Sequence, residues 1–202
     1  MPAGARGAVA FAHGSGSGRH SPRNRQVAEG LSAAGFATLL LDLLTVDEER
    51  EDLRTGRLRF DIALLGERVL RAVDWLAQEA DTADLDVGLF GASTGAAAAL
   101  VAAGRRPQRV RAVVSRGGRP DLAGEALREV TAPTLLIVGG ADTPVIGMNR
   151  DALRAMTCER HLEIVPGASH LFEEPGALET VTQHAREWFV RYLDASAGPA
   201  PG

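Results

Sequence analysis

The sequence predicts an α/β fold, with a doubly wound, mainly parallel sheet of about six strands flanked by helices. Short apolar runs alternate with amphipathic segments of helical period along the chain. The apolar runs are nearly continuous, which is typical of strands buried on both faces. Most runs give way to a turn rich in glycine or polar residues, and this alternation demands right-handed crossovers between parallel strands.

The first third of the chain is expected to hold two strands and one helix. The first strand enters a glycine-rich loop, the helix stops at a glycine, and the second strand ends at an aspartate. In order, these elements are Gly7–Ala12, Pro22–Ala34 and Phe36–Leu41. The next segment, Leu43–Arg59, is charged and irregular. With about 17 residues it is too short for a cap domain, so we expect a shallow, open pocket.

The middle of the chain continues the alternation. A long helix is expected from about Asp61 to Ala80, because its apolar residues recur at every third or fourth position. Asp86–Phe90 is the third strand, followed by an alanine-rich helix that runs to about Gly104. Val110–Ser115 is the fourth strand, and a short helix is expected near Gly124–Val130.

The last third adds two strands and two helices. Pro133–Val138 is a fifth continuous apolar run, and a helix is expected at about Gly147–Met156. His161–Val165 is the sixth strand. The final helix, at about Gly176–Leu193, carries its large apolar residues on one face.

Length and composition favour one globular domain. A chain of 202 residues suits a single sizeable core, so we expect one domain over residues 1–202 with an ordered core from about residue 7 to residue 193. Apolar residues make up 45% and aromatic residues 4%, which indicates an interior of Ala, Leu and Val. The ends, Met1–Arg6 and Ser196–Gly202, are rich in Pro, Gly and Ala and are expected to fray.

Charge and cysteine content exclude several classes of function. The formal charge is −4 and no lysine-rich tract occurs, which argues against nucleic acid as a partner. No signal-peptide pattern or membrane-length apolar run is present, so we expect a soluble cytoplasmic protein without a membrane partner. The single cysteine, Cys158, excludes an intramolecular disulfide and fits a reducing compartment.

Ligands of such sheets bind beyond the carboxyl ends of the strands. Polar residues that directly follow a strand are therefore expected on one shared rim. In chain order they are His13, Asp42, Ser93, Arg116, Asp142 and His170.

One turn on this rim has the pattern of a nucleophile elbow. Gly91-Ala92-Ser93-Thr94-Gly95 joins a buried strand directly to an alanine-rich helix. Such a strained turn exposes the serine hydroxyl and needs small neighbours. The amide of Thr94, at the helix N-terminus, can donate to a developing oxyanion. A tight turn that merely contains a serine is the alternative interpretation.

A serine nucleophile needs a base, and the base needs an orienting acid. His170 is the best placed of the five histidines, because it lies in the loop between the last strand and the last helix. Asp142 directly follows the penultimate strand, which gives the chain order Ser93, Asp142, His170. Asp121 is an alternative acid. Turn chemistry alone would also explain an aspartate at position 142.

Four stretches together resemble the α/β-hydrolase superfamily: the His13-Gly14 loop, the Gly91–Gly95 elbow, Leu135–Asp142 and Gly167–His170. The small size and the lack of a long lid resemble its dienelactone hydrolase family. The resemblance covers almost the whole chain and implies a minimal α/β-hydrolase fold without a large cap.

The resemblance also implies roles for individual residues. Ser93 would be the nucleophile, Asp142 the acid and His170 the base. The oxyanion would be held by the backbone amides of Thr94 and of Ser15, in the loop after the first strand.

The sequence departs from the family at the nucleophile. Dienelactone hydrolases proper use a cysteine, whereas this elbow carries Ser93. Dienelactone is therefore not implied as the substrate, and ordinary esterase chemistry is favoured. Cys158 is no substitute, because it lies between a helix and a strand start on the opposite rim and is expected to be inert.

Basic residues gather near the expected site. Arg19, His20, Arg23, Asn24 and Arg25 follow the first strand, and Arg116 and Arg119 follow the fourth. Arginine can hold a carboxylate or phosphate by forked hydrogen bonds. The candidate substrate-binding residues are His13, Arg116, Arg23 and Asn24. The alternative is a solvated basic face, or arginines paired with the acidic segment Asp47–Asp52.

We therefore expect a serine hydrolase that cleaves a small ester, thioester or lactone through an acyl-enzyme. No metal or organic cofactor is expected: metal-ligand spacing is missing, Gly14–Gly18 lacks the ending of a phosphate-binding P-loop, and no dinucleotide fingerprint follows the first strand. The partner would be a small-molecule substrate, and the protein a monomer or small homo-oligomer. The alternatives are a non-catalytic ligand-binding protein on this fold and an acyltransferase with the same triad.

Overall fold

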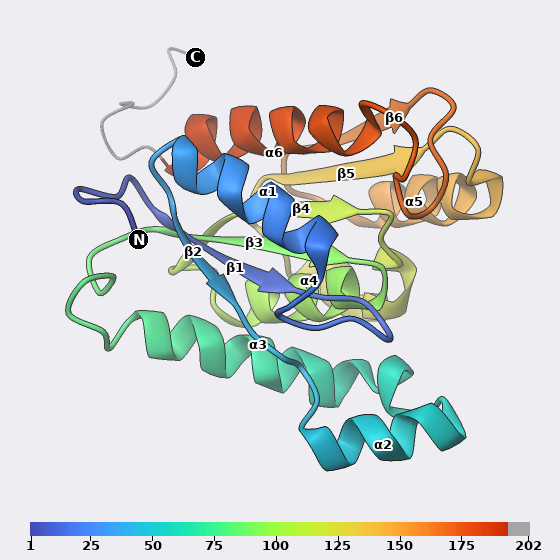
Figure 1. Cartoon of the computed structure of the whole chain (residues 1–202), viewed down its shortest axis with the longest axis horizontal. Coiled ribbons are helices and arrows are strands. Elements are labelled where there is room, and N and C mark those ends of the chain that lie inside the picture. Colours follow the sequence, from blue (N-terminus) through green and yellow to red (C-terminus); the bar gives the residue numbers. More distant parts are fainter. Residues whose placement is uncertain (194–202) are drawn as a thin grey trace.

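A six-stranded sheet lies at the centre of the computed structural model, which describes residues 1–193 (Figure 1). Every neighbouring pair of strands is parallel, and the order across the sheet is β2-β1-β3-β4-β5-β6. The strands are β1 (Ala8–Ala12), β2 (Ala37–Leu40), β3 (Val87–Ala92), β4 (Val110–Arg116), β5 (Thr134–Gly139) and β6 (Arg160–Val165). The predicted fold class is confirmed. The expected fraying of Ser196–Gly202 falls outside the described residues.

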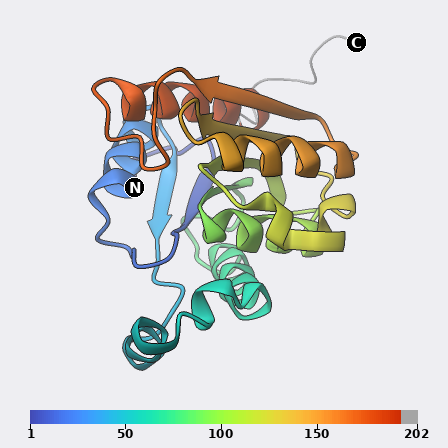
Figure 2. The ribbon, with the colours of Figure 1, turned by 90° about the vertical axis from the view of Figure 1, so that its right-hand side faces the viewer.

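Helices cover both faces of the sheet (Figures 1 and 2). The elements α1 and α6 lie on one face, and α3, α4, α5 and η2 lie on the other. The α-helices are α1 (Pro22–Ala33), α2 (Val46–Thr55), α3 (Ile62–Leu76), α4 (Thr94–Arg105), α5 (Thr143–Ala155) and α6 (Ala177–Leu193), and the 3-10 helices are η1 (Leu58–Phe60) and η2 (Pro120–Arg128). Among residues 1–193, no helix has the length and apolar character to cross a membrane.

The core consists of two apolar layers, one on each face of the sheet. The layer beneath α1 and α6 includes the fully buried Phe36, Phe90 and Phe189. A fully buried side chain of this size contributes roughly 1.5–3 kcal/mol to stability relative to an exposed one. On the other face, the first turns of α4 bury Ala96–Ala99 completely. These small side chains let the N-terminus of α4 lie close against the carboxyl ends of the strands.

The segment expected to be irregular, Leu43–Arg59, is largely helical, which corrects the prediction. Thr45 caps the N-terminus of α2, and Thr45 and Glu48 form a reciprocal capping box. The helix stands away from the sheet (Figures 1 and 2) and carries few apolar residues. Local capping, rather than an apolar face, therefore defines this helix.

Three further boundaries differ from the predictions. The helix α5 begins at Thr143, four residues earlier than expected, because Asp142 takes the cap position and Pro144 suits the first turn. The helix α3 ends at Leu76, before Ala80. The short helix expected at Gly124–Val130 is instead η2, which begins at Pro120 and is interrupted at Gly124.

Candidate active site

Ser93 occupies a strained turn between β3 and α4. Its φ of 50° and ψ of −124° lie where side-chain-bearing residues are rarely found. Such a conformation costs roughly 1–3 kcal/mol and must be held by its surroundings. Here the neighbours are glycines by necessity: a Cβ at Gly91 would collide with the Ala96 backbone, and one at Gly95 with the Ala12 carbonyl. The backbone thus has the geometry expected of a nucleophile elbow.

Asp142 and His170 form a hydrogen-bonded pair on the same rim. Asp142 directly follows the turn after β5, and His170 lies in the loop between β6 and α6. His170 Nδ1 lies 2.6 Å from Asp142 Oδ2. The side chain of Asp142 is 14% exposed and that of His170 is 39% exposed. A proton on Nδ1, shared with the carboxylate, leaves Nε2 free to act as a base.

The end of β4 connects Ser93 to this pair. The Ser93 N–H donates to the Arg116 carbonyl at 3.3 Å. The residue after Arg116, Gly117, faces the His170 ring: a Cβ added to Gly117 would lie 3.5 Å from His170 Nδ1. The hydrogen bonds found within residues 1–193 do not include one from Ser93 Oγ to His170 Nε2. Catalytic hydrogen bonds of this kind often shorten only when substrate binds.

The alternative acid, Asp121, is engaged elsewhere. Arg119 donates to its carboxylate through Nε at 2.9 Å and through Nη2 at 2.8 Å. Of the two candidate acids, Asp142 is therefore the one whose carboxylate contacts the His170 imidazole.

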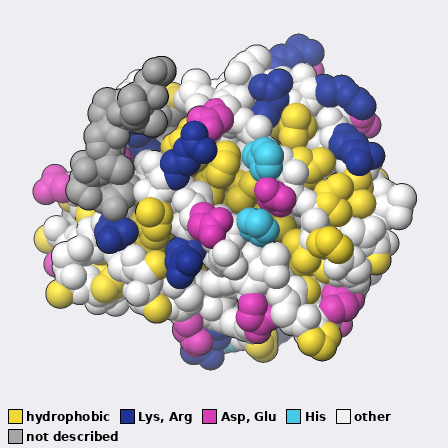
Figure 3. Space-filling view, turned by 90° about the horizontal axis from the view of Figure 1, so that it is seen from above, with side chains coloured by type: hydrophobic (Ala, Val, Ile, Leu, Met, Phe, Trp, Pro, Cys, Tyr) yellow, Lys and Arg dark blue, Asp and Glu magenta, His cyan; other side chains and the backbone are white. Residues whose placement is uncertain are grey.

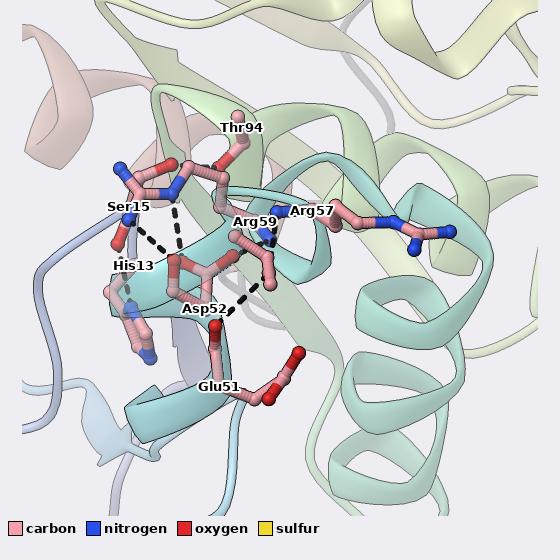
Figure 4. Close-up of polar contacts among 9 residues, drawn as sticks. His13, Ser15, Glu51, Asp52, Arg57, Arg59 and Thr94 are labelled. Carbon is pink, nitrogen blue, oxygen red and sulfur yellow. Dashed lines mark hydrogen bonds and ion pairs between the residues drawn. The ribbon is translucent and has the colours of Figure 1, made fainter. Parts of the chain in front are cut away.

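Two backbone amides lie beside Ser93. The loop after β1 passes so close that a Cβ on Gly14 would lie 2.8 Å from the Ser93 Cβ. The next residue, Ser15, has its hydroxyl 3.4 Å from that of Thr94 (Figure 4). Thr94 begins α4, so its N–H lacks an intrahelical acceptor. The bonds described for residues 1–193 include none from the Ser15 amide. Both N–H groups are thus available to a ligand at Ser93.

His13 positions this loop and does not present a free nitrogen to a ligand. Its side chain is buried, Nε2 accepts a hydrogen bond from the Leu43 amide at 2.8 Å, and Nδ1 lies 2.9 Å from the Gly14 carbonyl. Both ring nitrogens are therefore occupied by backbone groups, which fixes the Nδ1-protonated form. These two hydrogen bonds tie the loop of Ser15 to the segment that leads into α2, and substrate binding by His13 stays a prediction.

A cavity of about 450 Å³ opens beside Ser15 and Thr94. It lies between the glycine-rich loop, the N-terminus of α1, and α2. Leucine side chains from the chain around α2 and from α3 form its apolar wall, and charged groups line the rest. The apolar lining is Leu43, Leu44, Val46, Leu53 and Leu65, and the ionisable lining is His13, His20, Arg23, Asp42, Glu49, Asp52 and Arg59. The volume suits a small-molecule ligand.

A partly buried ion pair joins α2 to η1 beside this cavity. Arg59 Nε donates to Asp52 Oδ2 at 2.8 Å, and the Arg59 amide donates to Asp52 Oδ1 at 2.9 Å. The Asp52 side chain is only 5% exposed. Figure 4 shows this pair near Ser15 and Thr94, which line the same cavity. Sequence reasoning missed both residues, although the Thr45-x-x-Glu48 capping pattern signalled the helix that carries Asp52.

A second hollow, of about 310 Å³, lies between β6 and α6, and the described residues that line it do not include Ser93, Asp142 or His170. Its lining includes His161, Glu163 and His184. Figure 3 shows this side of the molecule, where histidine and acidic side chains lie among apolar ones. His161 Nε2 lies 3.0 Å from Glu163 Oε1. Among the described residues, no group of His, Cys, Asp and Glu has a geometry that would hold a metal ion.

Most arginines near the rim are paired. Arg19 contacts Asp42 at 2.9 Å, and Arg23 contacts Glu173 at 3.0 Å. The acidic segment Asp47–Asp52 pairs with arginines of α2, η1 and α3 rather than with those after β1. Arg116 differs, because it is 8% exposed and its Nη1 has no hydrogen-bond partner among residues 1–193. Asn24 is also buried, and within the same residues its Oδ1 has no hydrogen-bond partner.

Cys158 lies far from these groups, just before β6. Its side chain is buried, and burial raises the pKa of the thiol above its ordinary value. A thiol in this state is a poor nucleophile, which agrees with the expected inertness.

Comparison with known proteins identifies close relatives. A family model described as the dienelactone hydrolase family matches residues 9–194. The crystal structure of a dienelactone hydrolase from Anabaena variabilis superposes with a TM-score of 0.93 at 65% identity, over 96% of this chain and 89% of that one. Est1E from Butyrivibrio proteoclasticus with bound ferulic acid has a TM-score of 0.77 at 18% identity, over 92% and 89% of the two chains, which shows a shared fold.

The curated relatives are longer proteins. Sequences from two strains of Mycobacterium tuberculosis, each named a putative phosphoribosyl transferase, are 57% identical over 201 residues. The match takes in all of this chain but 44% of theirs. The chain thus spans less than half the length of the curated relatives it matches.

Proposed function

Because the chain belongs to the dienelactone hydrolase family, we propose that it is a serine hydrolase that cleaves a small carboxylic ester, thioester or lactone. The observation that carries this proposal is the 2.6 Å contact between Asp142 and His170 on the rim that holds the strained Ser93. The family supports hydrolysis as the reaction type, and the site residues support an acyl-enzyme route.

In the first step, Ser93 Oγ attacks the carbonyl carbon of the substrate while His170 Nε2 takes the hydroxyl proton. Asp142 holds the Nδ1 proton and stabilises the imidazolium that forms. The tetrahedral intermediate then expels the leaving oxygen or sulfur, which receives the proton from His170. The acyl group remains on Ser93 as an ester.

In the second step, water attacks the acyl-enzyme and the same proton transfers are repeated. His170 takes a proton from water as its oxygen attacks the acyl carbon, and the proton returns to Ser93 Oγ when the ester bond breaks. The products are a carboxylic acid and the restored hydroxyl. His170 is 39% exposed, which favours water as the acceptor of the acyl group.

The negative oxygen of both intermediates would be held by the amides of Ser15 and Thr94. The N-terminus of α4 adds the positive end of its dipole at the same point. Each such donor is worth about 10²–10³-fold in kcat. None of the proposed steps requires a metal or an organic cofactor.

The cavity supports a preference for small substrates. Its apolar wall is formed largely by leucines of the segment around α2, and its volume of about 450 Å³ is that of a small-molecule site. The name of the mycobacterial relatives belongs to proteins more than twice as long. Ser93, Asp142 and His170 lie in the region of this chain that matches those proteins.

Hydrolysis of p-nitrophenyl esters of increasing acyl length tests the proposal. We expect the highest kcat/KM for short acyl groups, and a loss of about 10³-fold or more in Ser93→Ala and His170→Ala with the fold intact. Ser32→Ala, on α1, serves as the matched control. Full turnover in Ser93→Ala, or a rate that peaks with long-chain esters, would contradict the proposal.

A further inference from the structure

Asn149 is a fully buried amide that joins two parts of the candidate active site. It lies in the interior of α5, the helix that begins directly after Asp142. Its Nδ2 donates to the Gly118 carbonyl at 2.9 Å and to the Val145 carbonyl at 2.8 Å. Both neighbours are acceptors, so the NH2 end of the amide must face them.

The two hydrogen bonds of Asn149 have different consequences. Val145 lies one turn earlier in α5, so the bond to its carbonyl fixes the Asn149 side chain against its own helix. Gly118 lies in the connection between β4 and η2, and α5 also packs against η2. We call this connection, residues 116–119, the β4 turn. The Asn149 side chain therefore ties α5 to the β4 turn.

The β4 turn holds both backbone polar groups of the candidate nucleophile. The Ser93 N–H donates to the Arg116 carbonyl at 3.3 Å, and the Ser93 carbonyl accepts from the Arg119 amide at 3.0 Å. A serine with a φ of 50° persists only where its surroundings enforce that conformation. These two hydrogen bonds are part of the enforcement, so a displaced β4 turn would displace Ser93.

The same turn lies against the loop of the candidate base. Gly117 has a φ of 52°, and a Cβ on it would lie 3.0 Å from the His170 carbonyl oxygen. A Cβ on Gly118 would lie 1.9 Å from Ser115 Oγ and 2.6 Å from the Ala96 Cβ. The β4 turn thus fits closely between the His170 loop and the first turn of α4, and its position relates the base to the nucleophile.

The Asn149 amide contributes through its donors. Its Oδ1 has no hydrogen-bond partner among residues 1–193, although the side chain is buried. An unsatisfied buried acceptor is costly, and a leucine of similar volume would avoid that cost. The leucine would, however, leave the Gly118 carbonyl without the donor that holds it. The feature that asparagine supplies here is therefore the NH2 group directed at the β4 turn.

We propose that Asn149 is a positioning residue of this hydrolase: it fixes the β4 turn to the helix that follows Asp142, and the turn holds Ser93 in its strained conformation beside His170. The proposal rests on the proposed function, which gives these three residues their roles. Asn149 acts through the turn and takes no part in proton transfer. Its loss should therefore lower kcat and leave KM close to the wild-type value.

The first test is hydrolysis of p-nitrophenyl acetate by Asn149→Leu at a temperature where the variant is fully folded. Leucine keeps the volume of the side chain and removes both donors. We expect kcat to fall by about 10–10²-fold at nearly constant KM, because displacement of a reacting group by about 1 Å has an effect of that size. If Asn149→Leu does not fold, Asn149→Ala removes the same donors without the risk of overpacking.

Ala152→Gly is the matched control. Ala152 is also buried in α5, and a glycine there loosens the helix while the Asn149 amide stays in place. A purely structural role of Asn149 would lower the Tm of both variants and the kcat of neither. The wild-type kcat in Asn149→Leu, or an equal loss of kcat in Ala152→Gly, would overturn the proposal.

Hydrogen exchange followed by mass spectrometry tests the same link without an ester substrate. The reporters are peptides that contain the Ser93 and Arg119 amides, because both amides donate across the contact between the elbow and the β4 turn. At least one of these peptides should exchange faster in Asn149→Leu than in the wild type, and both should exchange at the wild-type rate in Ala152→Gly. Unchanged exchange in Asn149→Leu, or faster exchange together with the wild-type kcat, would refute the positioning role. Faster exchange in a protein whose wild type hydrolyses no ester would instead refute the proposed function and leave the link between Asn149 and Ser93 standing.

Discussion

A single methyl group at Gly14 is expected to disable the site without unfolding the protein. The Cβ of an alanine would lie 2.8 Å from the Ser93 Cβ and 3.1 Å from the Ala92 carbonyl oxygen. The second neighbour is backbone and the first belongs to the strained elbow, so neither can easily move. The loop after β1 must therefore withdraw by several tenths of an ångström and carry the Ser15 amide away from the oxyanion.

The expected magnitude follows from the loss of one oxyanion donor. Such a loss lowers kcat by about 10²–10³-fold, with little effect on KM. The assay is hydrolysis of a short p-nitrophenyl ester by Gly14→Ala, with the Tm measured on the same sample. Gly147→Ala is the matched control, because its Cβ would meet no atom of residues 1–193 within 4 Å and the change removes a glycine from the interior of α5. It should keep the wild-type kcat and gain about 0.5–1 kcal/mol of stability. A Gly14→Ala enzyme with the wild-type kcat would refute the role of this loop.

Two further predictions follow from the geometry. Asp142→Asn should lower kcat by about 10⁴-fold, because the imidazole loses its orienting carboxylate. Asp121→Asn should change kcat less than tenfold, because its carboxylate holds Arg119. Comparable losses of kcat in the two variants would mean that the acid has been wrongly assigned. Asp52→Asn should lower the Tm and weaken the dependence of kcat/KM on acyl length, because it weakens the contact with Arg59 that holds α2. An unchanged dependence of kcat/KM on acyl length would show that α2 does not limit substrate size.

The sequence was most informative where local chemistry sets the structure. The strands are apolar runs with glycine or polar turns after them, so their positions and the rim that holds Ser93, Asp142 and His170 were predicted closely. The elbow was recognisable because a side chain at Gly91 or Gly95 would collide with backbone atoms, so a turn of this shape requires glycine at both positions. The Asp142–His170 contact was expected from chain order, because consecutive strand ends meet at one edge of a parallel sheet.

Other features depend on three-dimensional surroundings that local patterns do not encode. The helix α2 carries charged residues on most of its surface, so it lacks the apolar periodicity that predicts helices, and only its Thr45–Glu48 capping box marks it. His13 has the position of a binding residue, but its ring nitrogens are taken by backbone groups of its own loop and of Leu43. Nothing local distinguishes Arg116 from Arg119, yet in the described part of the chain the first lacks a carboxylate partner and the second has Asp121.

The central claim is that Ser93 is an activated nucleophile, and covalent labelling tests it most directly. A fluorophosphonate probe is incubated with the protein, and the modified peptide is located by mass spectrometry. The account predicts one adduct, on Ser93, which is abolished in Ser93→Ala, slowed strongly in His170→Ala and unchanged in Ser32→Ala. A protein that remains unlabelled while fully folded, or one that is labelled at another residue, would contradict it.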